Sequence, residues 1–139
     1  MGRGDVSIIG YTYSDYVGYA GSRKSTSGYI FQIRGDVISR RSHLQECVAL
    51  STIETRHVAA SETSKEAIWL SRLVSDMGIS QHVPKLFCDS QSAIDLAKNP
   101  IYHAKTKHIG VRCHFIHECL ANGSFALRSL FLEKMPQMH

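Results

Sequence analysis

The stretch from Val48 to Phe115 constrains the fold of this chain more than any other part of it. A long helical pattern, VALSTIETRHVAASETSKEAIWLSRL, is followed by a short apolar run, KLFC, that leads into Asp89. A second helical pattern comes next, and then a basic, histidine-rich segment, HAKTKHIGVRCHF. A buried strand set between helices is typical of an α/β arrangement, in which helices cover a sheet.

Size and composition indicate one ordinary globular domain. The chain has 139 residues, of which 43% are hydrophobic and 20% charged, enough for a single core. No apolar run is long enough to span a bilayer, and the first residues lack the apolar core of a secretory signal, so we expect no membrane partner. The 4 cysteines show no paired spacing. That pattern favours reduced thiols in an intracellular protein, either cytoplasmic or nuclear.

The N-terminal part of the chain is predicted to form three strands. The first covers about Val6 to Tyr13, a mostly apolar run, and the second covers Gly28 to Ile33. Gly35-Asp36 is a plausible hairpin turn between the second strand and a third. The third strand runs from Val37 to about Val48 and is polar at alternate positions.

A long helix is expected to follow these strands. Ser51 or Thr52 can cap its first turn, and Gly78 stands where a left-handed residue would end it. The elements expected after this helix are a short buried strand and two further helices, at Lys85–Cys88, Ser90 to about Pro100, and about Thr106 to Ala121, the last stopping at Asn122-Gly123. This order predicts an α/β fold, a mixed sheet with flanking helices.

Four segments carry a resemblance to a known family: GYTYSDYVG at 10–18, ALSTIETRH at 49–57, CDSQ at 88–91 and KTKHI at 105–109. Together they closely resemble the ribonuclease H domain of copia-type retrotransposon Pol polyproteins of plants. The resemblance covers about Ile9 to Leu127, within a single domain of 1–139 that has a divergent tail at 128–139. It implies a ribonuclease H-like fold. In that family four carboxylates hold two Mg²⁺ ions against the RNA strand of an RNA–DNA hybrid.

The same resemblance implies that most of the catalytic acids have been replaced. Asp89 stands at the position of the family's third acid, whereas Tyr13 and Arg56 stand at the positions of the first and second. The tail contains no aspartate and no recognisable motif for the fourth acid. A two-metal site needs several converging oxygen ligands, so Asp89 is expected to hold a metal weakly or not at all. Without the resemblance, Asp89 would read as a neighbour of a helix cap at a strand end.

Two nearby acids are possible substitutes. Asp15 lies two residues beyond Tyr13, which displaces it along a strand by about 6–7 Å. Glu54 is about 200° from Arg56 around a helix, so it is expected to face away from the site. Arg56 places a permanent cation where a metal would bind, and it can pair with Asp89 instead.

Basic residues offer a surface for nucleic acid. The net charge is +4, and four cations cluster near the second and third predicted helices, Lys98, Lys105, Lys107 and Arg112. Phosphate contacts need only such charges, so binding can outlast the loss of catalytic acids. A solvated basic face is the alternative interpretation.

A histidine- and cysteine-rich stretch near the last predicted helix has two interpretations. Cys113 and His117 are four residues apart, a spacing that can share a metal, but the paired spacings of structural zinc sites are absent. The other interpretation is a helix face without a metal role.

Three functions remain open from the sequence. The leading hypothesis is a retrotransposon-derived ribonuclease H-like domain, catalytically impaired, that retains binding of an RNA–DNA hybrid or other nucleic acid. The second is an active Mg²⁺-dependent hybrid ribonuclease that uses Asp15, Glu54 and Asp89. The third is a domain recruited for protein–protein interaction.

Overall fold

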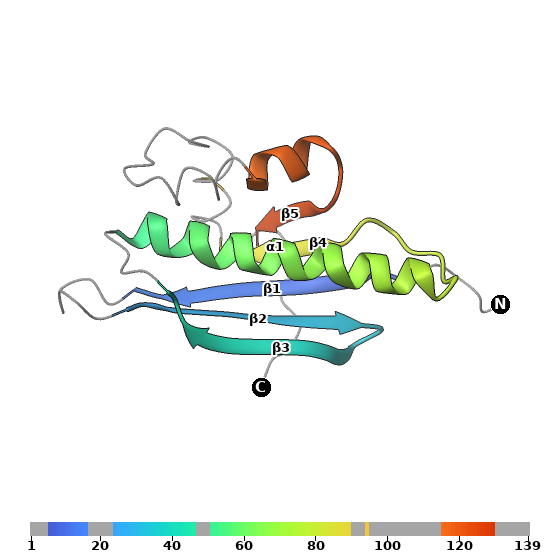
Figure 1. The fold of residues 1–139 in the computed structure, drawn as a ribbon, viewed down its shortest axis with the longest axis horizontal. Coiled ribbons are helices and arrows are strands. Elements are labelled where there is room, and N and C mark those ends of the chain that lie inside the picture. The colour runs from blue at the N-terminus through green and yellow to red at the C-terminus, as the bar shows by residue number, and fades with distance from the viewer. Residues whose placement is uncertain (1–5, 17–23, 47–50, 90–93, 95–114, 130–139) are drawn as a thin grey trace.

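The computed structural model of the chain describes residues 6–16, 24–46, 51–89, 94 and 115–129 (Figure 1). Residues 115–121 are helical, and the other elements are β1 (Ile8–Asp15), β2 (Thr26–Ile33), β3 (Asp36–Leu44), α1 (Thr52–Asp76), β4 (Lys85–Cys88) and β5 (Ala126–Ser129). None of the described helices is long and apolar enough to cross a membrane.

The five strands form one mixed sheet in the order β3-β2-β1-β4-β5. The antiparallel pairs are β1 with β2 and β2 with β3, while β1 with β4 and β4 with β5 are parallel. The parallel pair β1–β4 requires a crossover, and α1 supplies it by running back across the sheet (Figure 1). The predicted mixed sheet with flanking helices is therefore confirmed.

The strand bounds differ from the sequence prediction in all three N-terminal strands, and β2 starts at Thr26 rather than Gly28. The hairpin turn consists of Arg34 and Gly35, with φ of 55° and 84°, rather than Gly35-Asp36. Two successive left-handed residues match the twist of a tight hairpin, so Asp36 already begins β3. β1 starts at Ile8 rather than Val6 and continues to Asp15, because it pairs with β2 along its full length.

β3 ends at Leu44, before the predicted end near Val48. The next residue, Gln45, is buried and lies beside Ser25, one position before the start of β2. Its backbone N–H donates to the Ser25 carbonyl at 2.8 Å, and its side-chain amide donates to the Ser27 hydroxyl at 2.7 Å. The buried Gln45 side chain thus finds polar partners just beyond the end of β3.

α1 has the caps that its sequence predicts. Ser51 is the N-cap, and its hydroxyl accepts a hydrogen bond from the Glu54 backbone N–H at 3.1 Å. The helix ends at Asp76, and Gly78 follows with φ of 77°. The N-cap was one of two residues that the sequence allowed, and the structure selects Ser51 over Thr52.

Replacement of Ser51 by alanine is expected to lower the free energy of unfolding by about 1 kcal/mol, because one N–H in the first helical turn loses its partner. Urea denaturation followed by circular dichroism measures the change. Thr52→Ala is the matched control and should change stability by less than about 0.5 kcal/mol. An equal or larger loss in Thr52→Ala would contradict this assignment of the cap.

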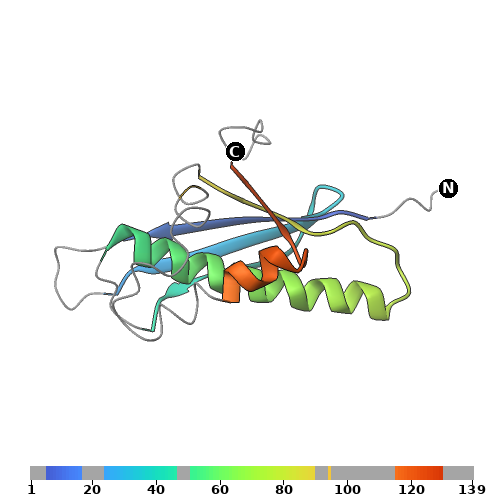
Figure 2. The ribbon, with the colours of Figure 1, turned by 90° about the horizontal axis from the view of Figure 1, so that it is seen from above.

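The core lies between the sheet and the helices, which cover the same face (Figure 2). Alternate β1 residues point toward α1, as Ile8 does at 0% exposure. The helix of residues 115–121 adds Ile116 and Cys119 to the same cluster. The buried members of this core are Val6, Ile8, Tyr29, Phe31, Ala60, Ala67, Leu70, Val74, Leu86, Ile116, Cys119 and Phe125.

β5 is an element that the sequence pattern did not predict. It pairs in parallel with β4 along all four of its residues, from Lys85↔Ala126 to Cys88↔Ser129. Arg128 and Ser129, which the sequence assigned to the start of the tail, are therefore part of the sheet. The preceding helix stops at Asn122-Gly123 as predicted, with φ of 75° at Gly123. Of the predicted helix from Ser90, only Ile94 is described, and it is helical.

Candidate active site

The positions that the resemblance predicts for the family's first three acids, Tyr13, Arg56 and Asp89, come from β1, α1 and the end of β4. In the parallel register of these two strands, Ile9 pairs with Lys85 and Tyr11 with Phe87. The Tyr11 and Phe87 rings stack on the same face of the sheet, with centroids 5.5 Å apart. Continuing this register by two residues brings Tyr13 level with Asp89, which is where a site shared between the two strands would form.

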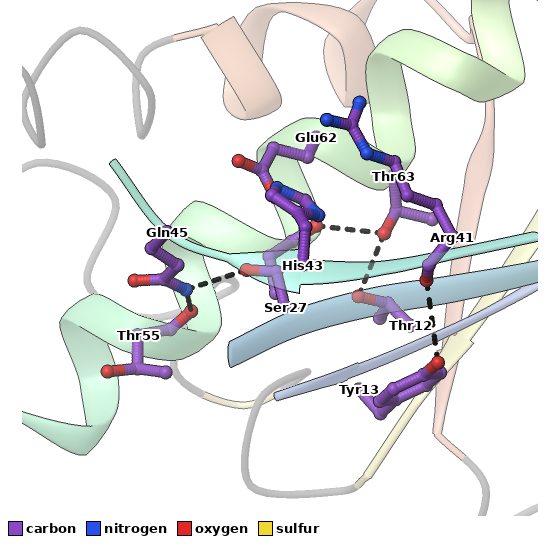
Figure 3. Close-up of polar contacts among 10 residues, drawn as sticks. Thr12, Tyr13, Ser27, Arg41, His43, Gln45, Thr55, Glu62 and Thr63 are labelled. Carbon is purple, nitrogen blue, oxygen red and sulfur yellow. Dashed lines mark hydrogen bonds and ion pairs between the residues drawn. The ribbon is translucent and has the colours of Figure 1, made fainter. Parts of the chain in front are cut away.

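Tyr13 lies across the sheet face opposite α1, as Figure 3 shows. Its ring covers Gly28 on β2 so closely that a Cβ built on Gly28 would be 2.2 Å from the ring. The Tyr13 hydroxyl donates a long hydrogen bond, 3.4 Å, to the Arg41 carbonyl oxygen on β3. Its side chain is 45% exposed. A tyrosine hydroxyl provides neither the charge nor the paired oxygens of the carboxylate that the family has here.

Arg56 and Asp89 form the ion pair that the sequence suggested. Arg56 Nε lies 3.9 Å from Asp89 Oδ2, with the two side chains 25% and 50% exposed. A pair this long and this exposed adds little to stability. Its importance is electrostatic, because a cation that cannot lose its proton stands beside the surviving acid.

The same two charges act on Cys88, the residue before Asp89. The pKa of the Cys88 thiol is raised to about 12, first by burial and second by the charge of Asp89, while the charge of Arg56 acts in the opposite direction. The thiol is therefore protonated at neutral pH and is neither a nucleophile nor a metal ligand there.

The two possible substitute acids, Asp15 and Glu54, differ in their exposure. Asp15 is exposed at the end of β1. Glu54 is 6% exposed, in the first turn of α1, while the Arg56 side chain is 25% exposed. Within the described ranges, which include all three acids, no group of three or more His, Cys, Asp or Glu side chains is placed to hold a metal ion.

The side chains at this site do not fit a pair of Mg²⁺ ions. Mg²⁺ requires several hard oxygen ligands in near-octahedral geometry. The three positions that would supply them carry a phenol, a guanidinium and one carboxylate, and the guanidinium is already paired with the carboxylate. We therefore derive no catalytic step through a metal ion in this chain.

Several candidate residues lie outside the described part of the chain. These are the four predicted nucleic-acid contacts, Lys98, Lys105, Lys107 and Arg112, together with His108, Cys113 and His114. Of the histidine- and cysteine-rich stretch, Cys119 is buried in the core and His117 is partly buried. Cys119 therefore has a packing role.

A polar layer between the sheet and α1 was not predicted. The alternate polar residues of β3 that the sequence shows include Ser39 and His43, and both contact α1. Figure 3 shows His43 beside Glu62 of α1. The contacts are Ser39 Oγ to Glu66 Oε2 at 2.8 Å, His43 Nε2 to Glu62 Oε1 at 3.2 Å, the Thr12 and Thr63 hydroxyls at 2.9 Å, and Gln45 Nε2 to the Thr55 carbonyl at 3.1 Å. They fix the part of α1 that carries Arg56. The alternation of polar residues along β3 was the sequence signal for this layer. It does not show whether the polar face of the strand meets α1 or solvent.

Comparison with known proteins finds relatives that match nearly the whole chain. It is 47% identical over 136 residues to the retrovirus-related Pol polyprotein from transposon TNT 1-94 of Nicotiana tabacum, a match that covers 98% of this chain and 10% of the relative. It is 32% identical over 134 residues to the Pol polyprotein from transposon RE2 of Arabidopsis thaliana, covering 96% of this chain and 9% of that one. The chain thus spans about a tenth of these relatives. No protein-family model matches it.

Solved structures give the same fold. A ribonuclease H1 isolated from compost, LC11-RNase H1, superposes with a TM-score of 0.62 at 12% identity, covering 94% of this chain and 85% of that one. A second structure of that protein, in complex with an RNA/DNA hybrid, gives 0.57 at 14% identity and covers 94% and 86%.

The fold and the strand ends that meet at Asp89 thus define a ribonuclease H-like domain. The sequence matches add the lineage: the chain belongs to the retrovirus-related Pol polyproteins of transposons, as their ribonuclease H-like domain.

Proposed function

We propose that this domain binds nucleic acid through phosphate contacts and does not hydrolyse an RNA–DNA hybrid. The ion pair between Arg56 and Asp89 carries the proposal. In a two-metal nuclease the cations activate water and stabilise the leaving oxygen, and the acids exist to hold those cations. A guanidinium 3.9 Å from the remaining acid occupies the place of that positive charge without its Lewis acidity.

Arg56 is suited to a different task at the same place. A guanidinium contacts phosphate oxygens through two parallel N–H donors, a geometry that lysine cannot reproduce. Because the Arg56 side chain is 25% exposed, a phosphate can reach it without unfolding the helix. The hybrid bound by LC11-RNase H1 gives the class of ligand that this fold accepts in that protein. The net charge of +4 favours a polyanion in general.

The expected result is binding that depends on salt and is indifferent to sequence. Each phosphate contact releases counterions, so about three to four contacts should give a log–log salt slope of about −2 to −4. Fluorescence anisotropy with a labelled RNA–DNA hybrid measures it. Replacing Lys105 and Lys107 by alanine should flatten the slope by about 2 and weaken all sequences alike.

Arg72→Ala is the matched control for this experiment. Arg72 is exposed on α1, 16 positions from Arg56 and so about 24 Å away along the helix. This variant removes one positive charge, where the double lysine variant removes two, and it should leave the salt slope unchanged. Absence of binding even at low salt would sink the proposal and favour a domain recruited for protein–protein interaction.

The same hybrid, incubated with Mg²⁺ or Mn²⁺, should remain intact. Gel analysis of the labelled RNA strand detects cleavage. Hydrolysis that disappears in Asp89→Asn would instead establish the active nuclease that uses the remaining acids.

A further inference from the structure

A cavity opens on the sheet near the start of β4, at the other end of this strand from Asp89. Its volume is about 420 Å³, within the range of pockets that hold small ligands. It is lined by Ser7, His82, Val83, Lys85, Ala126 and Arg128. Lys85 and Asp89 are four positions apart, so about 13 Å of strand separates this cavity from the ion pair of Arg56.

The side chains around the cavity have the character of an anion site. Lys85 and Arg128 are exposed cations on neighbouring strands, His82 is a third nitrogen group, and Ser7 adds a hydroxyl. No carboxylate is among the lining residues. Lys85 makes no ion pair with any residue that the structure describes, whereas His82 and Arg128 each have a further interaction. Lys85 is therefore the cation most available to a ligand.

Backbone hydrogen bonds hold the walls of this cavity in place. Lys85 pairs with Ile9 on one side and with Ala126 on the other. The His82 N–H donates to the Val6 carbonyl at 2.9 Å, and the Ala126 N–H donates to the Pro84 carbonyl at 2.8 Å. The cavity is thus formed before a ligand arrives, which reduces the entropy lost on binding.

The loop that contributes His82 and Val83 is also tied to α1. The Gln81 side-chain amide donates to the Ser71 carbonyl at 2.7 Å, and its backbone forms a parallel bridge with Val6. Val83 and Ala126 give the cavity an apolar side next to the cations. A ligand that matches both the cationic and the apolar side of the cavity has an anionic group attached to a less polar part.

We propose that this cavity is a binding site for the phosphate group of a nucleotide unit, either a free nucleotide or one unit of a strand. The phosphate contacts Lys85, Arg128 and the Ser7 hydroxyl, and the sugar or base lies against Val83 and Ala126. The site goes beyond the proposed function, because it uses neither Asp89 and Arg56 nor the predicted lysines near them. If a nucleic-acid strand occupies this cavity, the cavity adds a phosphate contact on a second part of the sheet.

Nuclear magnetic resonance titration of the whole chain tests this site. The probes are inorganic phosphate, adenosine 5′-monophosphate and a single-stranded oligonucleotide without a terminal phosphate. We expect the monophosphate to shift the amide signals of Ser7, Lys85 and Ala126 in a saturable way. Lys85→Ala should weaken this binding about tenfold, because one charge-assisted hydrogen bond is lost. Lys85→Arg should retain it.

Lys24→Ala is the control, since Lys24 is an exposed cation two residues before the start of β2 and does not line the cavity. The oligonucleotide identifies the source of the phosphate: saturable shifts at the same amides indicate a strand, and shifts with the monophosphate alone indicate a free nucleotide. Lack of saturable shifts with all three probes would overturn the proposal, as would equal weakening by Lys24→Ala and Lys85→Ala. The lysine pair at 105 and 107 is intact in all these variants, so failure here is distinct from failure of hybrid binding.

Discussion

Replacing Phe31 by alanine is expected to lower the free energy of unfolding by about 3–5 kcal/mol. Phe31 is 0% exposed in the middle of β2, and its ring packs edge-to-face against Tyr29, with centroids 5.5 Å apart and an interplanar angle of 66°. The ring also fills the space above Gly10, where an added Cβ would lie 2.4 Å from it. Alanine leaves a cavity that the surrounding strands cannot close, so both burial and packing are lost.

Urea denaturation gives this free energy, and Ile38→Ala is the control. Ile38 is 43% exposed on the edge strand β3, at the irregularity of the β2–β3 register, so its loss should cost less than about 1 kcal/mol. A similar loss from both variants would mean that the core is not centred on Phe31.

Exchanging Tyr13 for aspartate together with Arg56 for glutamate is expected to raise the affinity for Mg²⁺ more than tenfold. The change removes a cation that lies 3.9 Å from Asp89 and adds two carboxylates, one at that cation's position on α1 and one on β1. At an effective dielectric constant of about 20, one unit charge at about 4 Å is worth about 4 kcal/mol, so a tenfold gain survives considerable solvent screening. Isothermal titration calorimetry measures the affinity.

Two single variants separate the contributions. Arg56→Gln removes the cation without adding an acid, and Tyr13→Asn opens the space above Gly28 without adding charge. Each should bind Mg²⁺ more weakly than the double variant. An unchanged affinity in a folded double variant would show that Tyr13 and Arg56 do not match the family's acid positions.

Local signals in the sequence predicted the parts of the fold that depend on neighbouring residues. The start of α1 at Ser51 or Thr52, its end shortly before Gly78 and the short strand before Asp89 each follow from the chemistry of a few adjacent residues. β5 could not be recognised in the same way, because its four residues, ALRS, contain no apolar run like the KLFC that marks β4. Its pairing with β4 joins segments far apart in the chain, and tertiary contacts decide it.

The candidate site was predictable to a similar degree. The resemblance predicted Tyr13, Arg56 and Asp89 as site positions, and of this prediction the structure bears out the ion pair between Arg56 and Asp89. Burial of Glu54 did not follow, because helical spacing gives an angle around the axis but not what covers that side. The sequence also contained no sign that Lys85 lines a cavity, because that cavity depends on β5 lying next to β4.

Tyr13 and Gly28 are linked in a way that bears on the mutational history of the domain. While tyrosine occupies position 13, any side chain at position 28 displaces its ring, because the two would overlap at 2.2 Å. The ring is 45% exposed and can turn into solvent, so the sheet survives the change but Tyr13 loses its place on β2 and its bond to Arg41. A glycine at 28 is thus the condition under which this tyrosine stays ordered, and the order in which the two positions change determines which replacements either one tolerates.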